Sequence, residues 1–177
     1  MGVGHDRGTT SLTRFQRMLV GTDGTVTHLL EAYAGEPMEV VKLLQELETL
    51  DDVDPELDLA AGEKVLRRRV VLRGRHSGNS LLHAEALVAL SRVEPGFVDT
   101  LVTTEKPLGI VLAERRAETF REILTVGLEP AGPVGGHFGL DPTAAVVART
   151  YRIVADGRPL IVVTEKFPEA FFRSVPA

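Results

Sequence analysis

The sequence predicts an α+β fold, in which short helices cover a single antiparallel sheet of about six strands. Three observations support this prediction. Segments in which apolar and polar residues alternate recur along the chain, as in strands with one buried face. Short turns rich in Gly, Asp and Asn join several of these segments, which favours hairpins. Shorter stretches between the hairpins have apolar residues at helical spacing.

The composition limits the classes of protein to which the chain can belong. Its 177 residues suffice for one domain with a sizeable core, which we place at 11–177, after a flexible N-terminus at 1–10. The net charge of -5 argues against nucleic acid as a partner. The apolar runs are too short to span a membrane and no signal segment is recognisable, so we expect a cytoplasmic protein with no membrane partner. The lack of Cys excludes disulfides and thiolate metal sites.

Two short helices are predicted near the start of the chain. The segment 12–20 has apolar residues at helical spacing and stops at Gly21, which suits a C-cap. A turn at 22–27 leads into a second helix at 28–33, which stops at Gly35. Two short helices joined by a tight turn are expected to form a flap.

The rest of the chain is predicted to consist mainly of hairpins. An acidic loop at 51–58 is expected to be a solvated connection, and a Gly- and Pro-rich loop is expected at 131–142. The segment 119–126 fits a helix or a strand, but its β-branched residues and the following Gly127 and Pro130 favour a strand. The predicted strands are 38–47, 65–75, 81–90, 119–126, 144–154 and 159–167. Two further helices, each with a proline in its first turn, are predicted at 95–102 and 107–114.

One carboxylate lies on an apolar strand face. In the segment 159–167 side chains alternate between faces, so Ile161, Val163, Glu165 and Phe167 share one side. A buried carboxylate without a partner is costly or gives up its charge. Glu165 is therefore expected to have a partner in the interior of the protein.

The strand that follows the acidic loop carries a matching positive charge. Alternation places Arg68 on an apolar face with Leu66 and Val70. It places Arg67 and Arg69 on the opposite face, in a cationic stripe exposed to solvent. Arg68 is thus the counterpart of Glu165.

From the residues alone, two interpretations of Arg68 and Glu165 remain open. The first is a buried ion pair between them, which the spacing favours. The second is a ligand that separates them, with a carboxylate bound by the guanidinium and a hydroxyl bound by the carboxylate.

A wider pattern is carried by several segments in a specific order. They are 12–41, Arg68-x-Val70-Val71-Leu72, Pro107-Leu108-Gly109, Glu118-Thr119-Phe120, and Arg158-Pro159 followed by Thr164-Glu165-x-Phe167. Together they resemble the chorismate pyruvate-lyase family, over nearly the whole chain from Leu12 to Phe172. The segments Gly24-Thr25-Val26-Thr27 and Ala84-Glu85-Ala86-Leu87 resemble the actinobacterial branch more than the ubiquinone-pathway enzymes of proteobacteria.

This resemblance implies a chorismate lyase-like fold, in which helical flaps close over a buried ligand site. It implies conversion of chorismate into 4-hydroxybenzoate and pyruvate without a cofactor. Carried over to this sequence, Arg68 binds the ring carboxylate and Glu165 contacts the 4-hydroxyl group. Backbone groups at Val26 and Leu108, one in each flap, complete the carboxylate site.

The sequence departs from the best-known family members at Ala84-Glu85, where those enzymes have Gly-Arg. A second arginine for the pyruvyl carboxylate is therefore absent there, and Arg149 is a candidate to replace it. A two-residue turn at Asp156-Gly157 would place Ala148 opposite Glu165, whereas a three-residue loop would place Arg149 there. The sequence leaves this choice open.

The main alternative to the lyase is a non-catalytic binding module for a small aromatic carboxylic acid, because the same fold resembles the effector-binding domain of some transcription regulators. The expected partners are then chorismate and 4-hydroxybenzoate in the first case and such an acid in the second. The histidines show no metal-ligand spacing, so no metal is expected. Since each strand can pair within one chain, we expect a monomer.

Overall fold

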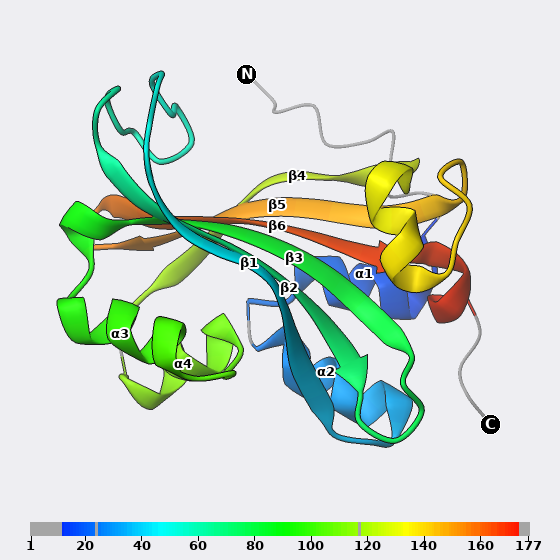
Figure 1. Ribbon diagram of the computed structural model, residues 1–177. Helices are drawn as coiled ribbons and strands as arrows, with labels where there is room; N and C mark the ends of the chain where they lie inside the picture. The colour runs from blue at the N-terminus through cyan, green and yellow to red at the C-terminus, as the bar shows by residue number, and fades with distance from the viewer. Residues whose placement is uncertain (1–11, 24, 117, 174–177) are drawn as a thin grey trace.

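The computed structural model describes residues 12–23, 25–116 and 118–173. The predicted flexible N-terminus at 1–10 lies outside these residues. Six antiparallel strands form one sheet in the order β1-β2-β3-β6-β5-β4 (Figure 1). The strands are β1 (Met38–Thr49), β2 (Lys64–Gly74), β3 (Ser80–Ala89), β4 (Phe120–Pro130), β5 (Ala145–Ala155) and β6 (Arg158–Pro168). The predicted α+β fold with an antiparallel sheet is confirmed, as is the choice of a strand at 119–126.

The sheet consists of two three-stranded meanders. Strands β1, β2 and β3 follow one another as hairpins, and so do β4, β5 and β6. The two halves join where β3 pairs with β6. Only β3 therefore separates β2 from β6, the strands that carry Arg68 and Glu165.

Four α-helices lie on one side of the sheet, which we call the inner face (Figure 1). They are α1 (Arg14–Gly21), α2 (Val26–Ala34), α3 (Pro95–Thr103) and α4 (Leu108–Glu114). In Figure 1, α1 and α2 lie towards one end of this face, and α3 and α4 towards the other.

Each pair of helices packs on its own apolar cluster. The α1–α2 cluster includes Leu19, Leu30 and Phe167. The α3–α4 cluster includes Leu101 and Ile161. Residues of both clusters line the cavity described below, which lies at the seam between the two clusters.

Local sequence explains where the helices begin and end. Thr13 caps α1 through a capping box with Gln16, whose side chain in turn accepts from the Thr13 backbone. The helix continues through Gly21, so the expected C-cap at Gly21 is wrong by one residue and Thr22 takes that position. Gly35 ends α2 as predicted, because its φ of 70° lies in the left-handed region that glycine adopts without strain.

Two predicted loops contain more structure than expected. The 3₁₀-helix η2 (Gly132–Phe138) occupies most of 131–142 and packs against β3. The acidic loop is not simply solvated, because Leu57 and the nearby Leu59 are buried against Val65 on the side of the sheet opposite the helices. This opposite side is called the outer face below.

The longest α-helix in the described part of the chain has nine residues. Within 12–23, 25–116 and 118–173, no helix is long and apolar enough to cross a membrane.

Candidate active site

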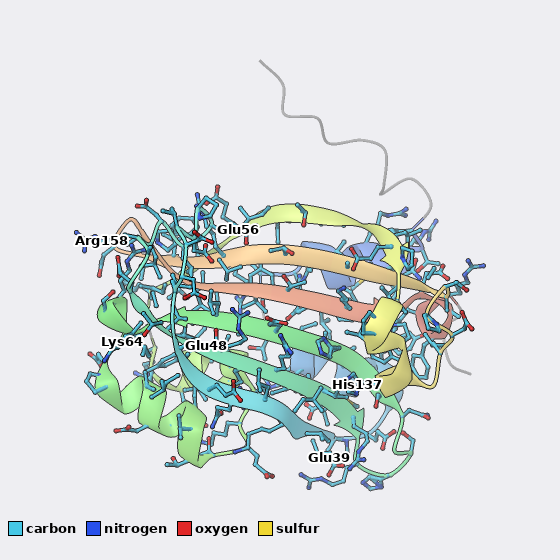
Figure 2. All side chains as sticks on the ribbon, turned by 45° about the horizontal axis from the view of Figure 1, so that its top comes forward. Glu39, Glu48, Glu56, Lys64, His137 and Arg158 are labelled. Carbon is cyan, nitrogen blue, oxygen red and sulfur yellow. The ribbon has the colours of Figure 1, made fainter. Side chains whose placement is uncertain are left out.

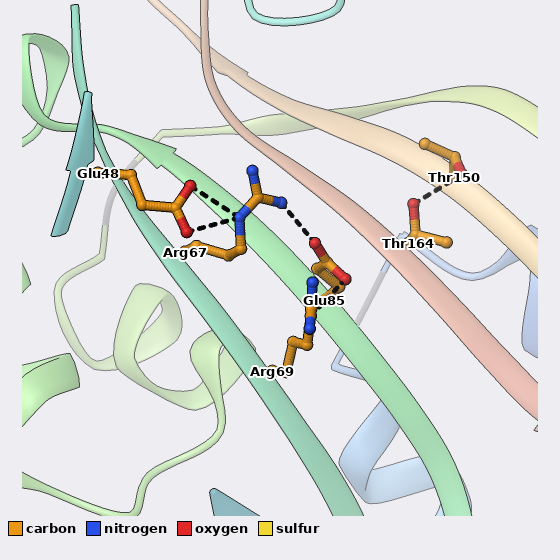
Figure 3. Close-up of polar contacts among 6 residues, drawn as sticks. All are labelled: Glu48, Arg67, Arg69, Glu85, Thr150 and Thr164. Carbon is orange, nitrogen blue, oxygen red and sulfur yellow. Dashed lines mark hydrogen bonds and ion pairs between the residues drawn. The ribbon is translucent and has the colours of Figure 1, made fainter. Parts of the chain in front are cut away.

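The three consecutive arginines of β2 separate onto the two faces of the sheet, as alternation predicts. Arg68 faces inward and is 3% exposed. On the outer face Arg67 donates to Glu48 at 2.9 Å and to Glu85 at 2.5 Å, and Arg69 donates to Glu85 at 2.8 Å (Figure 3). Figure 2 shows Glu48 among the many charged side chains around this face.

The Arg68 guanidinium is only partly satisfied by the protein. One terminal nitrogen donates to the backbone carbonyl of Lys106 at 3.1 Å, just before α4. Its Nε is buried and has no hydrogen-bond partner among the described residues. Burial lowers the pKa of Arg68 below its ordinary value. A buried cation with a spare donor is suited to bind an anion.

Glu165 is 3% exposed on the inner face of β6, and both of its oxygens accept hydrogen bonds. Arg149 Nε donates to Oε2 at 2.6 Å. The Tyr151 hydroxyl donates to Oε1 at 3.1 Å. The ion-pair partner of Glu165 is thus Arg149, and no hydrogen bond or ion pair between Arg68 and Glu165 occurs in the described ranges.

A β-bulge decides which residue meets Glu165. Asp156 and Gly157 form a two-residue turn with φ values of 50° and 71°, as the prediction of a tight turn requires. The register then shifts by one residue, because Val154 pairs with Pro159 but Ile153 pairs with Ile161. The unpaired residue is Leu160.

This shift resolves the choice that the sequence left open. Beyond the bulge, Arg149 lies opposite Glu165, and Thr150 lies opposite Thr164. The two threonine hydroxyls are 2.9 Å apart on the outer face (Figure 3). The turn therefore has two residues, yet the register is the one expected for a three-residue loop.

Arg149 is among the most buried side chains of the protein, at 1% exposure. Besides Glu165 it donates to the backbone carbonyl of Thr22 at 3.0 Å, at the end of α1. Its guanidinium also lies 4.9 Å from the centre of the Tyr151 ring. Arg149 lies behind Glu165 and is not among the residues that line the cavity described next.

A cavity of about 60 Å³ occupies the seam between the two apolar clusters. A single water needs about 10–15 Å³ on this measure, so the space holds several groups of that size. Small or apolar residues of the sheet form its floor, and segments at the starts of α2 and α4 form its walls. The charged side chains that line it are Arg68, Arg121 and Glu165.

Arg68 and Glu165 lie at different places along the cavity floor. Arg68 pairs with Ala86 on β3, and Glu165 pairs with Ala84 on the same strand. Two strand spacings of about 4.8 Å place β2 and β6 roughly 10 Å apart. The two alanines between them leave the space above β3 open.

The predicted backbone positions also line this cavity. Val26 is the first residue of α2, and Leu108 is the first residue of α4. Neither helix has a side-chain hydrogen bond from its N-cap residue, Thr25 or Pro107. The first N–H groups of both helices are therefore not capped by these side chains.

Sequence reasoning missed two polar side chains that line the cavity, those of Tyr151 and Arg121. Tyr151 shares the face of Arg149 two positions later on β5, so alternation from Arg149 would have identified it. Burial and the negative charge of Glu165 raise the pKa of Tyr151 above its ordinary value, so its hydroxyl remains a donor. Arg121 comes from the edge strand β4, where nothing in the local pattern marks it as functional.

The described residues contain no cluster of three or more His, Asp or Glu side chains suited to a metal ion. The His83 and His137 rings stack 5.5 Å apart, but on the outer face.

Residues 20–174 match the family described as "Chorismate pyruvate-lyase Rv2949c-like". The chain belongs to this family. The chorismate pyruvate-lyase of Mycobacterium tuberculosis (strain ATCC 25618 / H37Rv) is 32% identical over 179 residues, which cover 97% of this chain and 88% of that protein. The chorismate pyruvate-lyase of Mycobacterium leprae (strain TN) is 32% identical over 166 residues, which cover 93% and 79%. The resemblance inferred from the ordered motifs is thus confirmed.

Among solved structures, the fold is shared with regulator domains. The effector domain of PhnF from Mycobacterium smegmatis has a TM-score of 0.65 and 17% identity, over 83% of this chain and 90% of that one. The C-terminal domain of the histidine utilization repressor from Pseudomonas syringae pv. tomato has a TM-score of 0.63 and 14% identity, over 79% and 97%. At these identities, the comparison shows only that this member of the chorismate pyruvate-lyase family shares its fold with those domains.

Proposed function

We propose that this protein is a lyase that converts chorismate into 4-hydroxybenzoate and pyruvate. The observation that carries the proposal is the placement of Arg68 and Glu165 along one buried cavity in a member of the chorismate pyruvate-lyase family. The reaction needs no co-reactant, because the atoms of the two products together are those of chorismate. Loss of the enolpyruvyl group and of the C4 hydrogen makes the ring aromatic, which supplies much of the driving force.

Arg68 binds the ring carboxylate in this proposal. A guanidinium can meet a carboxylate with two parallel hydrogen bonds. The buried Arg68 Nε without a protein partner supports this role. A carboxylate bound there would also compensate a positive charge that the protein otherwise buries without an anionic partner.

Glu165 contacts the 4-hydroxyl group at the other end of the ring. The separation of roughly 10 Å between β2 and β6 accommodates a ring between the two side chains. Arg149 and Tyr151 support this role because they hold the two Glu165 oxygens in place before a ligand arrives. Positioning of this kind lowers the cost of reaching the reactive geometry.

The starts of α2 and α4 act as two flaps that complete the carboxylate site through backbone N–H groups at Val26 and Leu108. Their positions in the cavity wall and the missing side-chain caps support this assignment. Arg149 belongs to the site through Glu165, which it positions, rather than through direct contact with the ring.

The test is to incubate the purified protein with chorismate and to measure pyruvate and 4-hydroxybenzoate together. We expect both products in equal amounts, and we expect Arg68→Met to abolish their formation. Release of neither product by the unmodified protein would contradict the proposal.

The second candidate is a non-catalytic binder of a small aromatic carboxylic acid. The fold shared with an effector domain and with the ligand-binding domain of a putative GntR-family regulator from Bordetella bronchiseptica favours it. Tight binding of 4-hydroxybenzoate without turnover of chorismate would identify this function.

A further inference from the structure

The cavity contains an arginine that the proposed contacts to ring carboxylate and hydroxyl do not use. Arg121 of β4 lines the cavity, and its Nε is buried without a hydrogen-bond partner among the described residues. One terminal nitrogen donates to the backbone carbonyl of Asp23, in the turn before α2. Its guanidinium lies 5.8 Å from the centre of the Tyr151 ring. This donor is therefore charged, held in place and only partly satisfied.

The charges around the cavity exceed what one carboxylate of a ligand would balance. Arg68 and Arg121 line the cavity, and Arg149 lies behind Glu165. Three guanidinium groups face one carboxylate among these described residues, which leaves two positive charges in excess. A ligand with two carboxylates would balance them, and chorismate is such a ligand.

The order of these groups across the sheet matches the chemistry of chorismate. Arg68 lies on β2, Glu165 on β6, Tyr151 on β5 and Arg121 on β4. Arg121 therefore lies two strands beyond the strand of Glu165, opposite Ile153 and level with Ile161 of β6. In chorismate the enolpyruvyl ether is attached next to the carbon that bears the hydroxyl, so its carboxylate extends from that same end of the ring.

Arg149, the candidate suggested by the sequence, is less suited to this carboxylate. Its Nε donates to Glu165 and its Nη1 to Thr22. Its Nη2 is buried without a hydrogen-bond partner among the described residues, but Arg149 is not among the residues that line the cavity. Arg121, in contrast, lines the cavity that would hold the ligand. A Cβ placed on Gly109 would lie 3.3 Å from the Thr25 methyl carbon, 3.6 Å from the Thr25 hydroxyl and 3.8 Å from an Arg121 terminal nitrogen. The absence of a side chain at Gly109 thus allows the start of α4, Thr25 and Arg121 to approach one another closely.

We propose that Arg121 binds the second carboxylate of the substrate, that of the enolpyruvyl group. This inference rests on the proposed lyase function, and it assigns the end of the substrate that becomes pyruvate. Thr25 and Gly109 border the same subsite. Arg121 is a substrate-binding residue here, and its bond to Asp23 holds the guanidinium in position.

The test compares two stable ligands that differ by one carboxylate. The monocarboxylate is 4-hydroxybenzoate, and the dicarboxylate is 3-(carboxymethoxy)-4-hydroxybenzoate. Their dissociation constants are measured by calorimetry for the unmodified protein, for Arg121→Met and for the matched control Arg152→Met. Arg152 lies on the same strand pair but on the outer face, where it donates to Glu122 at 2.7 Å.

We expect Arg121→Met to weaken the dicarboxylate about 10- to 100-fold while changing 4-hydroxybenzoate by less than about threefold. The control should change neither ligand. An equal loss for both ligands would mean that Arg121 only holds the flap through Asp23, and no loss for either would mean that it contacts neither. Both results overturn the proposal.

A second measurement needs no variant. The carboxamide counterpart of the dicarboxylate, with a carbamoylmethoxy group, has the same shape and lacks the second charge. The unmodified protein should prefer the dicarboxylate by about tenfold or more, and equal affinities overturn the proposal. Because neither measurement depends on turnover, failure of the chorismate assay and failure of the Arg121 subsite are distinguishable.

Discussion

Arg149 Nε lies 2.6 Å from Glu165 Oε2, with 0% and 4% of the two side chains exposed. The bond joins neighbouring strands at directly opposed positions. Tyr151 holds the other oxygen of the same carboxylate. The carboxylate is therefore fixed from two sides within the protein, and its orientation does not depend on a ligand.

Removing one partner of this buried pair should be more damaging than removing both. Arg149→Met leaves the Glu165 charge buried without its cation, which should lower the free energy of unfolding by about 3–5 kcal/mol. The double variant Arg149→Met/Glu165→Gln should recover much of that loss but not the lyase activity. Urea unfolding of the unmodified protein, Arg149→Met, Glu165→Gln and the double variant checks this, and strictly additive losses would contradict it.

Arg68→Met should separate binding from stability. It removes a buried guanidinium with no anionic partner among the described residues, so the free energy of unfolding should stay the same or rise. Binding of 4-hydroxybenzoate should weaken about 100-fold, because a charge-assisted pair is lost.

Arg69→Met is the matched control for Arg68→Met. It removes an outer-face ion pair with Glu85, which should change stability by at most about 1 kcal/mol and leave binding intact. Calorimetry with 4-hydroxybenzoate measures both variants. Equal losses of binding would show that the assignment of faces on β2 is wrong.

Tyr151→Phe should remove one hydrogen bond to Glu165 without creating a cavity beside it. The ring remains, but the donor to Oε1 is lost, which should lower the free energy of unfolding by about 1–2 kcal/mol. We expect kcat for pyruvate release to fall about tenfold. Tyr33→Phe is the control, because the Tyr33 hydroxyl donates to the Phe171 carbonyl away from the cavity. An unchanged kcat in Tyr151→Phe would exclude a positioning role.

The outer face should make the protein sensitive to mild acid through His83. Burial, and next the charge of the neighbouring His137, lower the pKa of His83 to about 4. In the unfolded chain a histidine has a pKa of about 6.5. Between these pH values the unfolded chain binds more protons than the folded protein. The contribution of neutral His83 to the free energy of unfolding is therefore fully present above about pH 6.5 and is lost as the pH falls towards 4.

Replacing His83 by Gln should flatten this part of the stability profile. Urea unfolding at several pH values between about 7 and 4 measures the slope. The control is His76→Gln, since His76 is exposed in the turn after β2. A slope that is the same in the unmodified protein and in His83→Gln would contradict the prediction.

Alternation was sufficient to assign Arg68, because β2 runs without irregularity from Val65 to Leu72 in its pairing with β3. It was not sufficient for the partner of Glu165. A single unpaired residue between the turn and the site changes which side chain lies opposite, and nothing local marks Leu160 as that residue. The strand between the turn and Glu165 is long enough to contain one such irregularity, which places Arg149 instead of Ala148 opposite Glu165.

Other features depended on contacts between distant segments. Arg121 becomes part of the cavity only because β4 lies beside β5, and its place on an edge strand suggests a solvated charge. The acidic composition of 51–58 predicted a solvated loop, but Leu57 is buried because the loop folds back onto the outer face. Local composition does not show which distant segment a loop or an edge strand will contact.

The bulge at Leu160 also determines which insertions and deletions the hairpin tolerates. Deleting Leu160 would give a regular ladder in which Arg149 still meets Glu165, because the bulged residue has no partner to lose. Adding or removing one residue between Ile161 and Glu165 would instead turn the carboxylate to the outer face. Loss of Leu160 would therefore leave the site in place, whereas the number of residues from Ile161 to Glu165 cannot change by one without removing the carboxylate from the cavity.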